Sequence, residues 1–351
     1  MNKVFFGDCR AVMRELIAQG VKAQTCVTSP PYWGLRDYGA AGQLGLERLH
    51  DCLGWATGDR CGECHVCNMV EVFRLVRELL ADDGTCWVNY GDSYVHGGCG
   101  ARDSERWPKQ ARNDHTATYA KSFAGLKPKD QVGMPWRIAL ALQADGWYLR
   151  QDIIWHKPNP MPESVRDRCT KAHEYVFLLS KSERYFFDQA AIAEPAIYGR
   201  TPTGVGFGHG YDEQEKSRAV SIPSGWDTSA GSHRELTGRY ERESQPKGSF
   251  DGKTGDKAFR KTGETRNKRT VWTIPTKPYS EAHFATYPPE LIEPCILAGS
   301  RPGDIVFDPF FGSGTTGEVA ERLGRQWIGT ELNEAYGPLQ KKRTAQIGMA
   351  I

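Results

Sequence analysis

The sequence lacks a long hydrophobic run and a strong net charge, and each absence excludes a class of protein. No stretch approaches the roughly 20 apolar residues of a membrane-spanning helix, and the first residues show no signal-peptide pattern. The formal net charge of the 351 residues is +2, so a site for a polyanion must be local. We therefore expect a cytoplasmic protein with no membrane partner. With 39% hydrophobic residues, it can bury one good core and carry a smaller appended region.

A proline-rich tetrapeptide follows the first clear strand pattern. Residues 23–28 are mostly apolar, and Ser29-Pro30-Pro31-Tyr32 comes directly after them. Two prolines fix φ and supply no N–H, so the neighbouring carbonyls are expected to face outward as acceptors for a substrate. Tyr32 offers an aromatic face on which a planar base can stack. Taken alone, the tetrapeptide is equally compatible with a plain turn at a strand end.

A second motif lies near the other end of the sequence, where residues 304–308 predict a strand and residues 312–317 a glycine-rich turn before a helix. This order is typical of the cofactor half of a Rossmann-like fold, and Glu331 ends the next apolar run, where a ribose-binding acid would lie. The GxGxxG spacing also fits a nicotinamide dinucleotide. However, Asp308 before the turn suits a cationic ligand such as S-adenosylmethionine better than a pyrophosphate.

The apolar periodicity predicts an alternation of strands and helices. Strands are expected over residues 3–6, 23–28, 85–90, 147–156 and 172–180, and helices after Asp8 and over residues 69–80, 132–144, 289–298 and 318–323. Joining the two ends of the sequence would give a doubly wound sheet. The glycine-rich turn and the Ser-Pro-Pro-Tyr turn would then lie on neighbouring strands, whose carboxyl ends are the usual place for a ligand.

The two motifs, followed by a glutamate one strand later, resemble those of the permuted beta group of DNA amino-methyltransferases. Weaker matches occur at residues 153–159, 173–177 and 283–291, so the resemblance extends over most of the sequence. It implies an α/β, Rossmann-like, S-adenosylmethionine-dependent methyltransferase fold with circularly permuted motif order.

The resemblance also implies roles for individual residues. Ser29, Pro30, Pro31 and Tyr32 would form the catalytic site, where the Ser29 hydroxyl and the Pro30 carbonyl accept the amino hydrogens of a flipped base. Trp33 is a further candidate for stacking on that base. The expected cofactor-binding residues are Asp8, Asp308, Pro309, Phe310, Gly312, Ser313, Gly314, Thr315, Thr316 and Glu331.

In this family Ser-Pro-Pro-Tyr is mostly associated with N4-cytosine, whereas Asp- or Asn-Pro-Pro-Tyr is mostly associated with N6-adenine. We therefore expect a site-specific N4-cytosine DNA methyltransferase. An N6-adenine enzyme is the alternative, and a nucleic-acid-binding protein without turnover is a third reading. Pro294-Cys295 is the dipeptide of covalent C5-cytosine chemistry, but the apolar face expected over residues 289–298 makes Cys295 a core thiol.

Four of the ten cysteines lie within 16 residues, at the spacing C-x8-C-x2-C-x2-C. Without a secretory signal, such a cluster favours metal binding over disulfides. We expect one structural Zn²⁺ in a small insertion over residues 50–68. Reduced thiols and an iron–sulfur cluster are the alternatives, and His50 and His65 are candidate substitute ligands. The expected metal ligands are Cys52, Cys61, Cys64 and Cys67.

Two long polar segments, residues 96–130 and 198–270, interrupt the apolar pattern and are too poor in aliphatic residues to build a core. The resemblance places target recognition in the second. We expect a catalytic half over 1–190, a target-recognition region over 191–270 and a cofactor half over 271–351; a solvated insertion without contacts is the alternative. The residues expected to bind double-stranded DNA are Lys257, Arg260, Lys261, Arg266, Lys268 and Arg269.

The resemblance further implies a bacterial or phage protein that works near the nucleoid. Two settings stay open: action beside a cognate restriction endonuclease, without direct contact, and action alone. The sequence leaves the recognition sequence and the oligomeric state open.

Overall fold

The computed structural model describes residues 2–35, 39–47, 61–95, 126–195, 265–277 and 287–345. Contacts divide the chain into two compact units, Met1–Ile192 with Lys268–Ile351, and Ala193–Asn267. The described part of the second unit contains an antiparallel pair, β6 (Glu194–Pro195) and β7 (Thr265–Arg266). The functions predicted for residues 1–190, 191–270 and 271–351 stay predictions.

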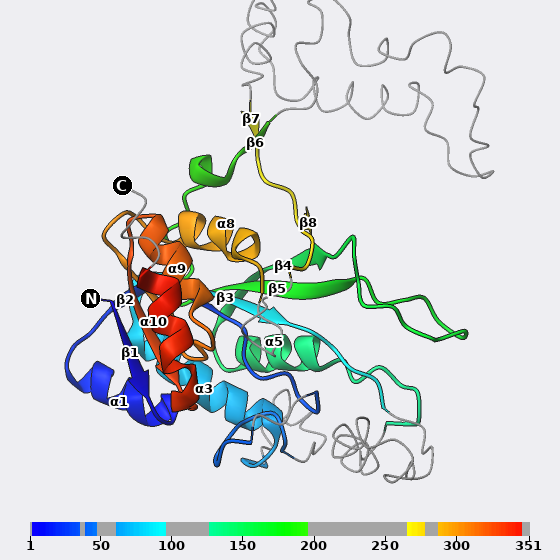
Figure 1. The fold of residues 1–351 in the computed structure, drawn as a ribbon. Helices are drawn as coiled ribbons and strands as arrows, with labels where there is room; N and C mark the ends of the chain where they lie inside the picture. Colours follow the sequence, from blue (N-terminus) through cyan, green and yellow to red (C-terminus); the bar gives the residue numbers. More distant parts are fainter. Residues whose placement is uncertain are drawn as a thin grey trace, which may run out of the picture. The chain divides into compact units, whose positions relative to one another are not determined.

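The first unit is built on an eight-stranded sheet with the order β1-β10-β9-β2-β3-β5-β4-β8 (Figure 1). The strands from β1 to β3 in this order pair in parallel, whereas β5 runs antiparallel to both β3 and β4. Their bounds are β1 Lys3–Phe6, β2 Ala23–Thr28, β3 Leu80–Tyr90, β4 Tyr148–His156, β5 His173–Ser180, β8 Val271–Thr273, β9 Ile305–Asp308 and β10 Gln326–Glu331.

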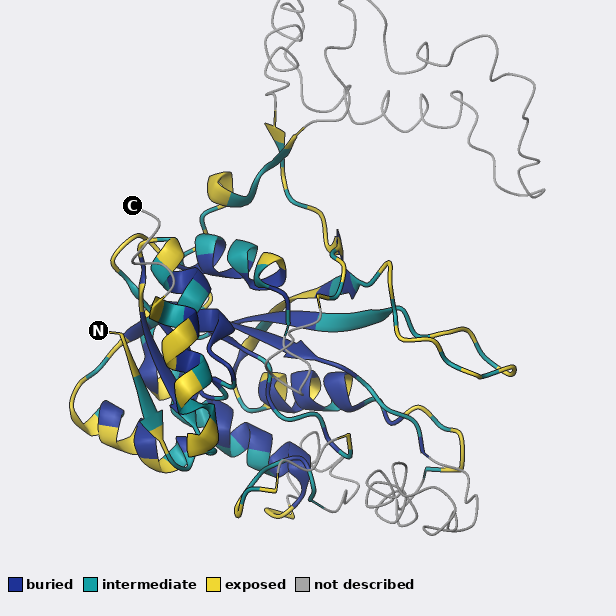
Figure 2. Cartoon of the chain, viewed as in Figure 1, coloured by how far each residue is buried: buried dark blue, intermediate teal, exposed yellow. Residues whose placement is uncertain are grey.

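Helices cover both faces of this sheet, as a doubly wound fold requires (Figure 1). On β2, Cys26 packs into the core formed with α1, α3 and α5, whereas its neighbour Val27 packs into the core formed with α8 and α9. This alternation follows from the two-residue period of a strand, and Figure 2 shows the central strands buried. The helices are α1 Cys9–Ala18, α3 His65–Leu79, α5 Met134–Ala144, α8 Pro289–Gly299, α9 Thr315–Arg322 and α10 Gly337–Ala345.

The predicted helices and strands are present, and the structure adds the short strands β6, β7 and β8 and the helix α10. Strand β8 was not predicted because only Trp272 of its three residues is buried, which leaves little pattern to detect. Helix α10 was also not predicted. Cys295 on α8 is 1% exposed, and burial raises the pKa of its thiol, so the prediction of a core thiol is confirmed. In the described ranges, the helices are too short or too polar to span a bilayer.

The strand order confirms that the two motifs lie on neighbouring strands. β9 pairs in parallel with β2, with Val306 opposite Thr25 and Phe307 opposite Cys26. Because parallel strands end at the same edge of a sheet, the Ser-Pro-Pro-Tyr turn after β2 and the glycine-rich turn after β9 open on one side.

Candidate active site

A cavity of about 800 Å³ lies at the carboxyl ends of the central strands. Its walls come from segments almost 300 residues apart in the sequence. The lining includes Asp8, Ser29, Pro30, Pro31, Tyr32, Asn89, Lys157 and Glu174 from the N-terminal side and Pro309, Phe310, Gly312, Ser313, Thr315 and Glu331 from the C-terminal side. Among the predicted cofactor residues, Asp308, Gly314 and Thr316 lie behind this wall.

Tyr32, in the catalytic turn of residues 29–32, lies at the edge of the cavity, where its one hydroxyl proton has two acceptors within reach. The Tyr32 hydroxyl lies 2.7 Å from Glu174 Oε2 and 2.9 Å from Asn89 Oδ1, both acceptors. Burial and the Glu174 carboxylate raise the pKa of Tyr32, so its hydroxyl stays protonated. Ser29 Oγ is 3.4 Å from the same hydroxyl, a long and weak contact. The Ser29 lone pairs therefore remain available to a ligand.

Tyr90, at the end of β3, contacts the backbone of this turn at Pro31 and Trp33. The structure corrects what the sequence predicted for these two residues. The Pro31 carbonyl does not face outward unpaired, because it accepts a hydrogen bond from the Tyr90 hydroxyl at 3.2 Å. Trp33 is not a stacking surface: it is 5% exposed, and its indole N–H donates to the Glu47 carbonyl at 2.6 Å. The Tyr32 ring packs against the Tyr90 ring in a tilted arrangement, with the centroids 4.7 Å apart and 31° between the ring planes.

Two charged residues that the sequence did not identify as functional line the cavity beside Tyr32. Lys157, just after β4, forms an ion pair with Glu174 on β5, and both side chains are less than one-fifth exposed. Asn89 Nδ2 lies 3.3 Å from Glu174 Oε2. Lys157 and Glu174 could have been identified from the sequence as charged residues at the ends of otherwise apolar strands. They give the cavity both donors and acceptors for the edge of a base.

The glycine-rich turn forms the opposite wall and is fixed by the next strand and by α10. Glu331, at the end of β10, accepts hydrogen bonds from the backbone N–H groups of Gly312 and Asn333, both at 2.8 Å. Gly312 has φ +53°, which favours glycine. Arg343 of α10 donates to Ser313 Oγ at 2.6 Å. Burial raises the pKa of Glu331 although these backbone donors oppose the shift.

Asp308 joins the two walls from behind the cavity. The carboxylate is 1% exposed and accepts hydrogen bonds from Thr28 Oγ1 and Thr316 Oγ1, each at 2.6 Å, and from the Tyr287 hydroxyl at 3.1 Å. The backbone N–H of Phe310 is a fourth donor, at 3.0 Å. Burial raises the pKa of Asp308, and these donors counteract the shift. Direct contact with a cofactor stays a prediction, whereas the observed contacts tie β2 to the cofactor turn.

Asp8 lines the cavity where α1 begins. Its carboxylate caps that helix by accepting from the Arg10 N–H at 2.8 Å and forms an ion pair with the Arg10 guanidinium at 2.7 Å. The side-chain hydrogen bond to Arg10 lowers the pKa of Asp8, so the group is ionised near neutrality.

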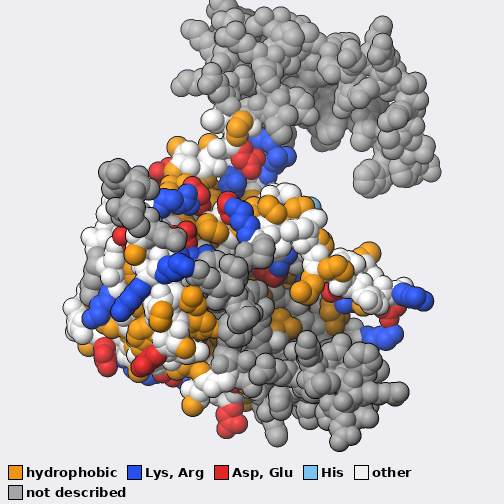
Figure 3. Space-filling view, in the orientation of Figure 1, with side chains coloured by type: hydrophobic (Ala, Val, Ile, Leu, Met, Phe, Trp, Pro, Cys, Tyr) orange, Lys and Arg blue, Asp and Glu red, His pale blue; other side chains and the backbone are white. Residues whose placement is uncertain are grey.

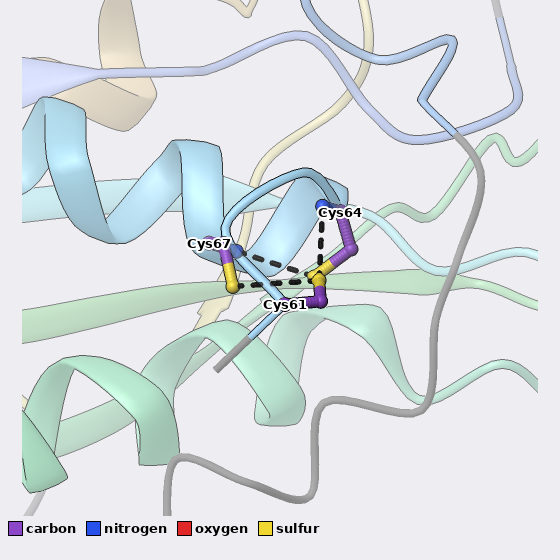
Figure 4. Close-up of side chains that lie close together, drawn as sticks. All are labelled: Cys61, Cys64 and Cys67. Carbon is purple, nitrogen blue, oxygen red and sulfur yellow. Dashed lines mark hydrogen bonds between the residues drawn. The ribbon is translucent and has the colours of Figure 1, made fainter. Parts of the chain in front are cut away.

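Three of the four predicted metal ligands lie together at the N-terminal end of α3 (Figure 4). Their sulfur atoms lie within 4.8 Å of one another, and Cys61 Sγ is 3.8 Å from Cys67 Sγ. Two sulfurs bound to one tetrahedral zinc at about 2.3 Å would be about 3.8 Å apart. The geometry of Cys61, Cys64 and Cys67 therefore fits a metal, while Cys52 and His50 lie outside the described residues.

His65 is not a substitute ligand, which corrects another expectation. Its side chain is fully buried, with Nδ1 2.9 Å from Glu47 Oε2 and Nε2 2.7 Å from the Tyr90 hydroxyl. Both ring nitrogens are thus engaged away from the cysteines.

The structure describes three of the six basic residues predicted to contact DNA. Arg266 lies 3.5 Å from Glu194, and the Lys268 ammonium lies over the Trp272 ring at 5.1 Å. Arg269 accepts a hydrogen bond at its backbone carbonyl from Trp272 Nε1. Lys257, Arg260 and Lys261 lie outside the described residues, and DNA contact by all six stays a prediction.

A doubly wound sheet with a glycine-rich turn and a proline-rich turn on one cavity defines an α/β protein of the Rossmann-like methyltransferase class. Comparison with known families specifies the class further. The chain belongs to the DNA methylase family N6_N4_Mtase, whose model matches residues 23–342. It is 41% identical over 347 residues to the type II methyltransferase M.SmaI of Serratia marcescens, covering 97% of this chain and 90% of that protein.

Solved structures show the same fold at low identity. The PvuII DNA methyltransferase, described as cytosine-N4-specific, is 17% identical with a TM-score of 0.54, covering 99% of this chain and 90% of that one. A putative DNA modification methylase from Thermus thermophilus, in complex with S-adenosyl-L-methionine, is 22% identical with a TM-score of 0.51, covering 100% and 96%. The prediction of an α/β methyltransferase fold is confirmed.

Proposed function

We propose that this protein transfers the methyl group of S-adenosylmethionine to the exocyclic N4 of a flipped cytosine in double-stranded DNA. The observation that carries the proposal is the single cavity with Ser29 and Tyr32 on one wall and Gly312 and Glu331 on the other. Serine as the first residue of the turn, instead of an acid, favours cytosine over adenine by resemblance to the family.

The lining residues account for the chemistry. The cytosine amino nitrogen is a poor nucleophile because its lone pair is delocalised into the ring. Ser29 Oγ and the Pro30 carbonyl would accept its two hydrogens and free that lone pair for attack on the methyl carbon. The N–C bond forms as the C–S bond breaks, giving S-adenosylhomocysteine, and the nitrogen releases one proton to solvent. Positioning and electrostatics supply the acceleration, with no covalent intermediate on the protein.

Other lining groups suit the remaining parts of the base and the DNA. Stacking of the base on Tyr32 would offset part of a flipping cost of a few kcal/mol. Lys157 can donate to the O2 carbonyl of cytosine, a group that adenine lacks. On the face drawn in Figure 3, Lys and Arg side chains stand at the tip of the β4–β5 connection. Such a projection suits phosphate contacts.

Methyl transfer to mixed-sequence DNA, followed by nucleoside mass spectrometry, tests the proposal. We expect N4-methylcytosine. Recovery of N6-methyladenine alone would favour the alternative enzyme, since the fold serves both bases. A protein that binds S-adenosylmethionine but transfers no methyl group to any DNA would support the binding-only reading.

Glu331 should give cofactor binding a distinctive pH dependence. An ionised Glu331 accepts hydrogen bonds from the ribose hydroxyls, and protonation removes this capacity. Because burial raises its pKa, affinity for S-adenosylmethionine should start to fall at a higher pH than for an ordinary glutamate. The cofactor-free protein should respond in the opposite sense: a raised folded pKa gives a contribution to stability that is present at low pH and lost as pH rises through it.

Calorimetric titration across the acid range measures this effect. Glu331→Gln should weaken S-adenosylmethionine binding about tenfold near neutrality. It should also reduce the change of that affinity with pH in the acid range. An identical slope in the variant would assign the titration to another group.

We also propose that Cys61, Cys64 and Cys67, with Cys52 as the predicted fourth ligand, hold a structural zinc ion. The backbone N–H groups of Cys64 and Cys67 donate to the preceding thiols, Cys61 Sγ at 3.3 Å and Cys64 Sγ at 3.4 Å. Backbone N–H groups placed in this way could also donate to metal-bound sulfur atoms. Protein dialysed without chelator should contain about one zinc per chain by elemental analysis. Cys64→Ser should lose it, and Cys169→Ser, at an exposed cysteine, should retain it. Absence of zinc from the wild-type protein would refute this site.

A further inference from the structure

The cysteine site and the catalytic turn are connected by an unbroken series of buried contacts. Cys64 is the N-cap residue of α3, and His65 is the first residue of that helix. The position of His65 therefore follows directly from how the cysteines fix the helix end. Its Nε2 lies 2.7 Å from the Tyr90 hydroxyl.

Tyr90 carries the connection into the catalytic turn. Its hydroxyl accepts from the Trp33 N–H at 2.8 Å and donates to the Pro31 carbonyl at 3.2 Å, so it bonds the backbone on both sides of Tyr32. Its ring also packs on the Tyr32 ring. The Tyr90 hydroxyl and His65 Nε2 share one hydrogen bond, and the histidine tautomer sets its direction.

Glu47 fixes the histidine from its other side. Its carboxylate accepts from the Gly45 N–H at 2.7 Å and the Asn68 amide at 3.0 Å, and lies 2.9 Å from His65 Nδ1. Because Glu47 also holds Trp33 through its backbone carbonyl, the histidine and the catalytic turn share one support. Neither His65 nor Tyr90 lines the cavity, so both act through the residues that do.

We infer that the cysteine site is a positioning device for methyl transfer: a bound zinc ion fixes the start of α3, and His65 and Tyr90 transmit that order to residues 31–33. This inference rests on the proposed function for its catalytic consequence only. The structural consequence, order in the turn, can be measured without any turnover.

Tyr90→Phe tests the second half of the connection, because it keeps the ring and removes the hydroxyl. Amide hydrogen exchange of a peptide over residues 29–35 is the direct readout, since its two prolines carry no N–H and the Trp33 amide loses its acceptor. We expect exchange of that amide to rise about tenfold, the effect of about one hydrogen bond. Zinc content and S-adenosylmethionine affinity should match the wild type, while kcat falls about 10- to 100-fold. Tyr148→Phe, at an exposed tyrosine of β4, is the matched control.

Cys64→Ser tests the first half. Serine is a preferred N-cap, so α3 keeps its cap while the metal ligand is lost. We expect the same peptide to exchange faster than in the wild type, and removal of zinc by a chelator to reproduce the change. Restoring Zn²⁺ should reverse it in the wild-type protein and not in Cys64→Ser.

The outcomes separate this inference from the proposed function. Unchanged exchange over residues 29–35 in Tyr90→Phe would show that Tyr90 does not hold the turn. If exchange changes in Tyr90→Phe but not on zinc removal, the cysteine site does not influence the order of residues 29–35. If both perturbations change exchange but the wild-type protein methylates no DNA, the positioning connection stands and the proposed function fails.

Discussion

Replacing Ser29 by alanine is expected to lower kcat for methyl transfer by about 10²- to 10³-fold, the usual effect of removing one fixed polar group from a transition state. Ser29 lines the cavity, and its hydroxyl makes only a long contact with Tyr32. Its loss therefore leaves the surrounding hydrogen bonds in place while removing an acceptor for the amino group. Affinity for S-adenosylmethionine should stay within about twofold, because Glu331 and Gly312 lie on the opposite wall.

Single-turnover methylation with labelled cofactor measures this effect, and calorimetry provides the binding comparison. Ser182→Ala is a suitable control, because this serine lies in the loop after β5 and bonds the Asp82 carbonyl away from the cavity. Activity of Ser29→Ala within threefold of the wild type would remove Ser29 from the catalytic mechanism. A parallel loss of cofactor affinity would instead assign it to the cofactor wall.

Asp308→Ala is expected to have the largest effect on both folding and cofactor binding. The substitution removes the buried acceptor of the Thr28, Tyr287 and Thr316 hydroxyls, and each buried hydroxyl left without another partner costs about 1–3 kcal/mol. Because the three bonds belong to one network and do not add, we expect the free energy of unfolding to fall by about 3 kcal/mol. The glycine-rich turn should lose its attachment to β2, and cofactor affinity should fall at least about 100-fold.

Urea unfolding and calorimetry measure the two effects. Asp308→Asn keeps the shape and one acceptor, so it should fold more stably than Asp308→Ala and allow binding to be measured if the alanine variant does not fold. Asp152→Ala, at an exposed carboxylate of β4, is the control. If Asp308→Asn binds the cofactor normally and Asp308→Ala loses no stability, the network does not hold the turn.

Sequence reasoning succeeded best where local chemistry dictates structure. The glycines of residues 312–317 and the prolines after β2 restrict their own backbones, so the two turns were predicted from residue type. The apolar periodicity located the main strands and helices for the same reason. It did not find β8 or α10, because short or polar elements owe their structure to neighbours rather than to their own pattern.

The functional details depended on contacts between distant segments. The fold surrounds Asp308 with donors from β2, α9 and Tyr287, contacts that the sequence could not predict, and its contact with a cofactor stays a prediction. His65 looked like a metal ligand because it lies between cysteines, yet Tyr90 and Glu47 engage both of its nitrogens. Partners that lie far apart in the sequence cannot be read from local spacing.

The sequence by itself therefore determined the α/β class, the two turns, the cysteine cluster and the resemblance to DNA amino-methyltransferases, because each depends on residue type at short spacing. The tertiary structure decided which groups share the cavity and which lie behind it. It placed Glu174 and Lys157 beside Tyr32, buried Asp308 behind the cavity, and connected the start of α3 to residues 31–33 through His65 and Tyr90. The physical reason is that parallel pairing of β2 with β9 brings together side chains almost 300 residues apart, and burial then fixes their partners.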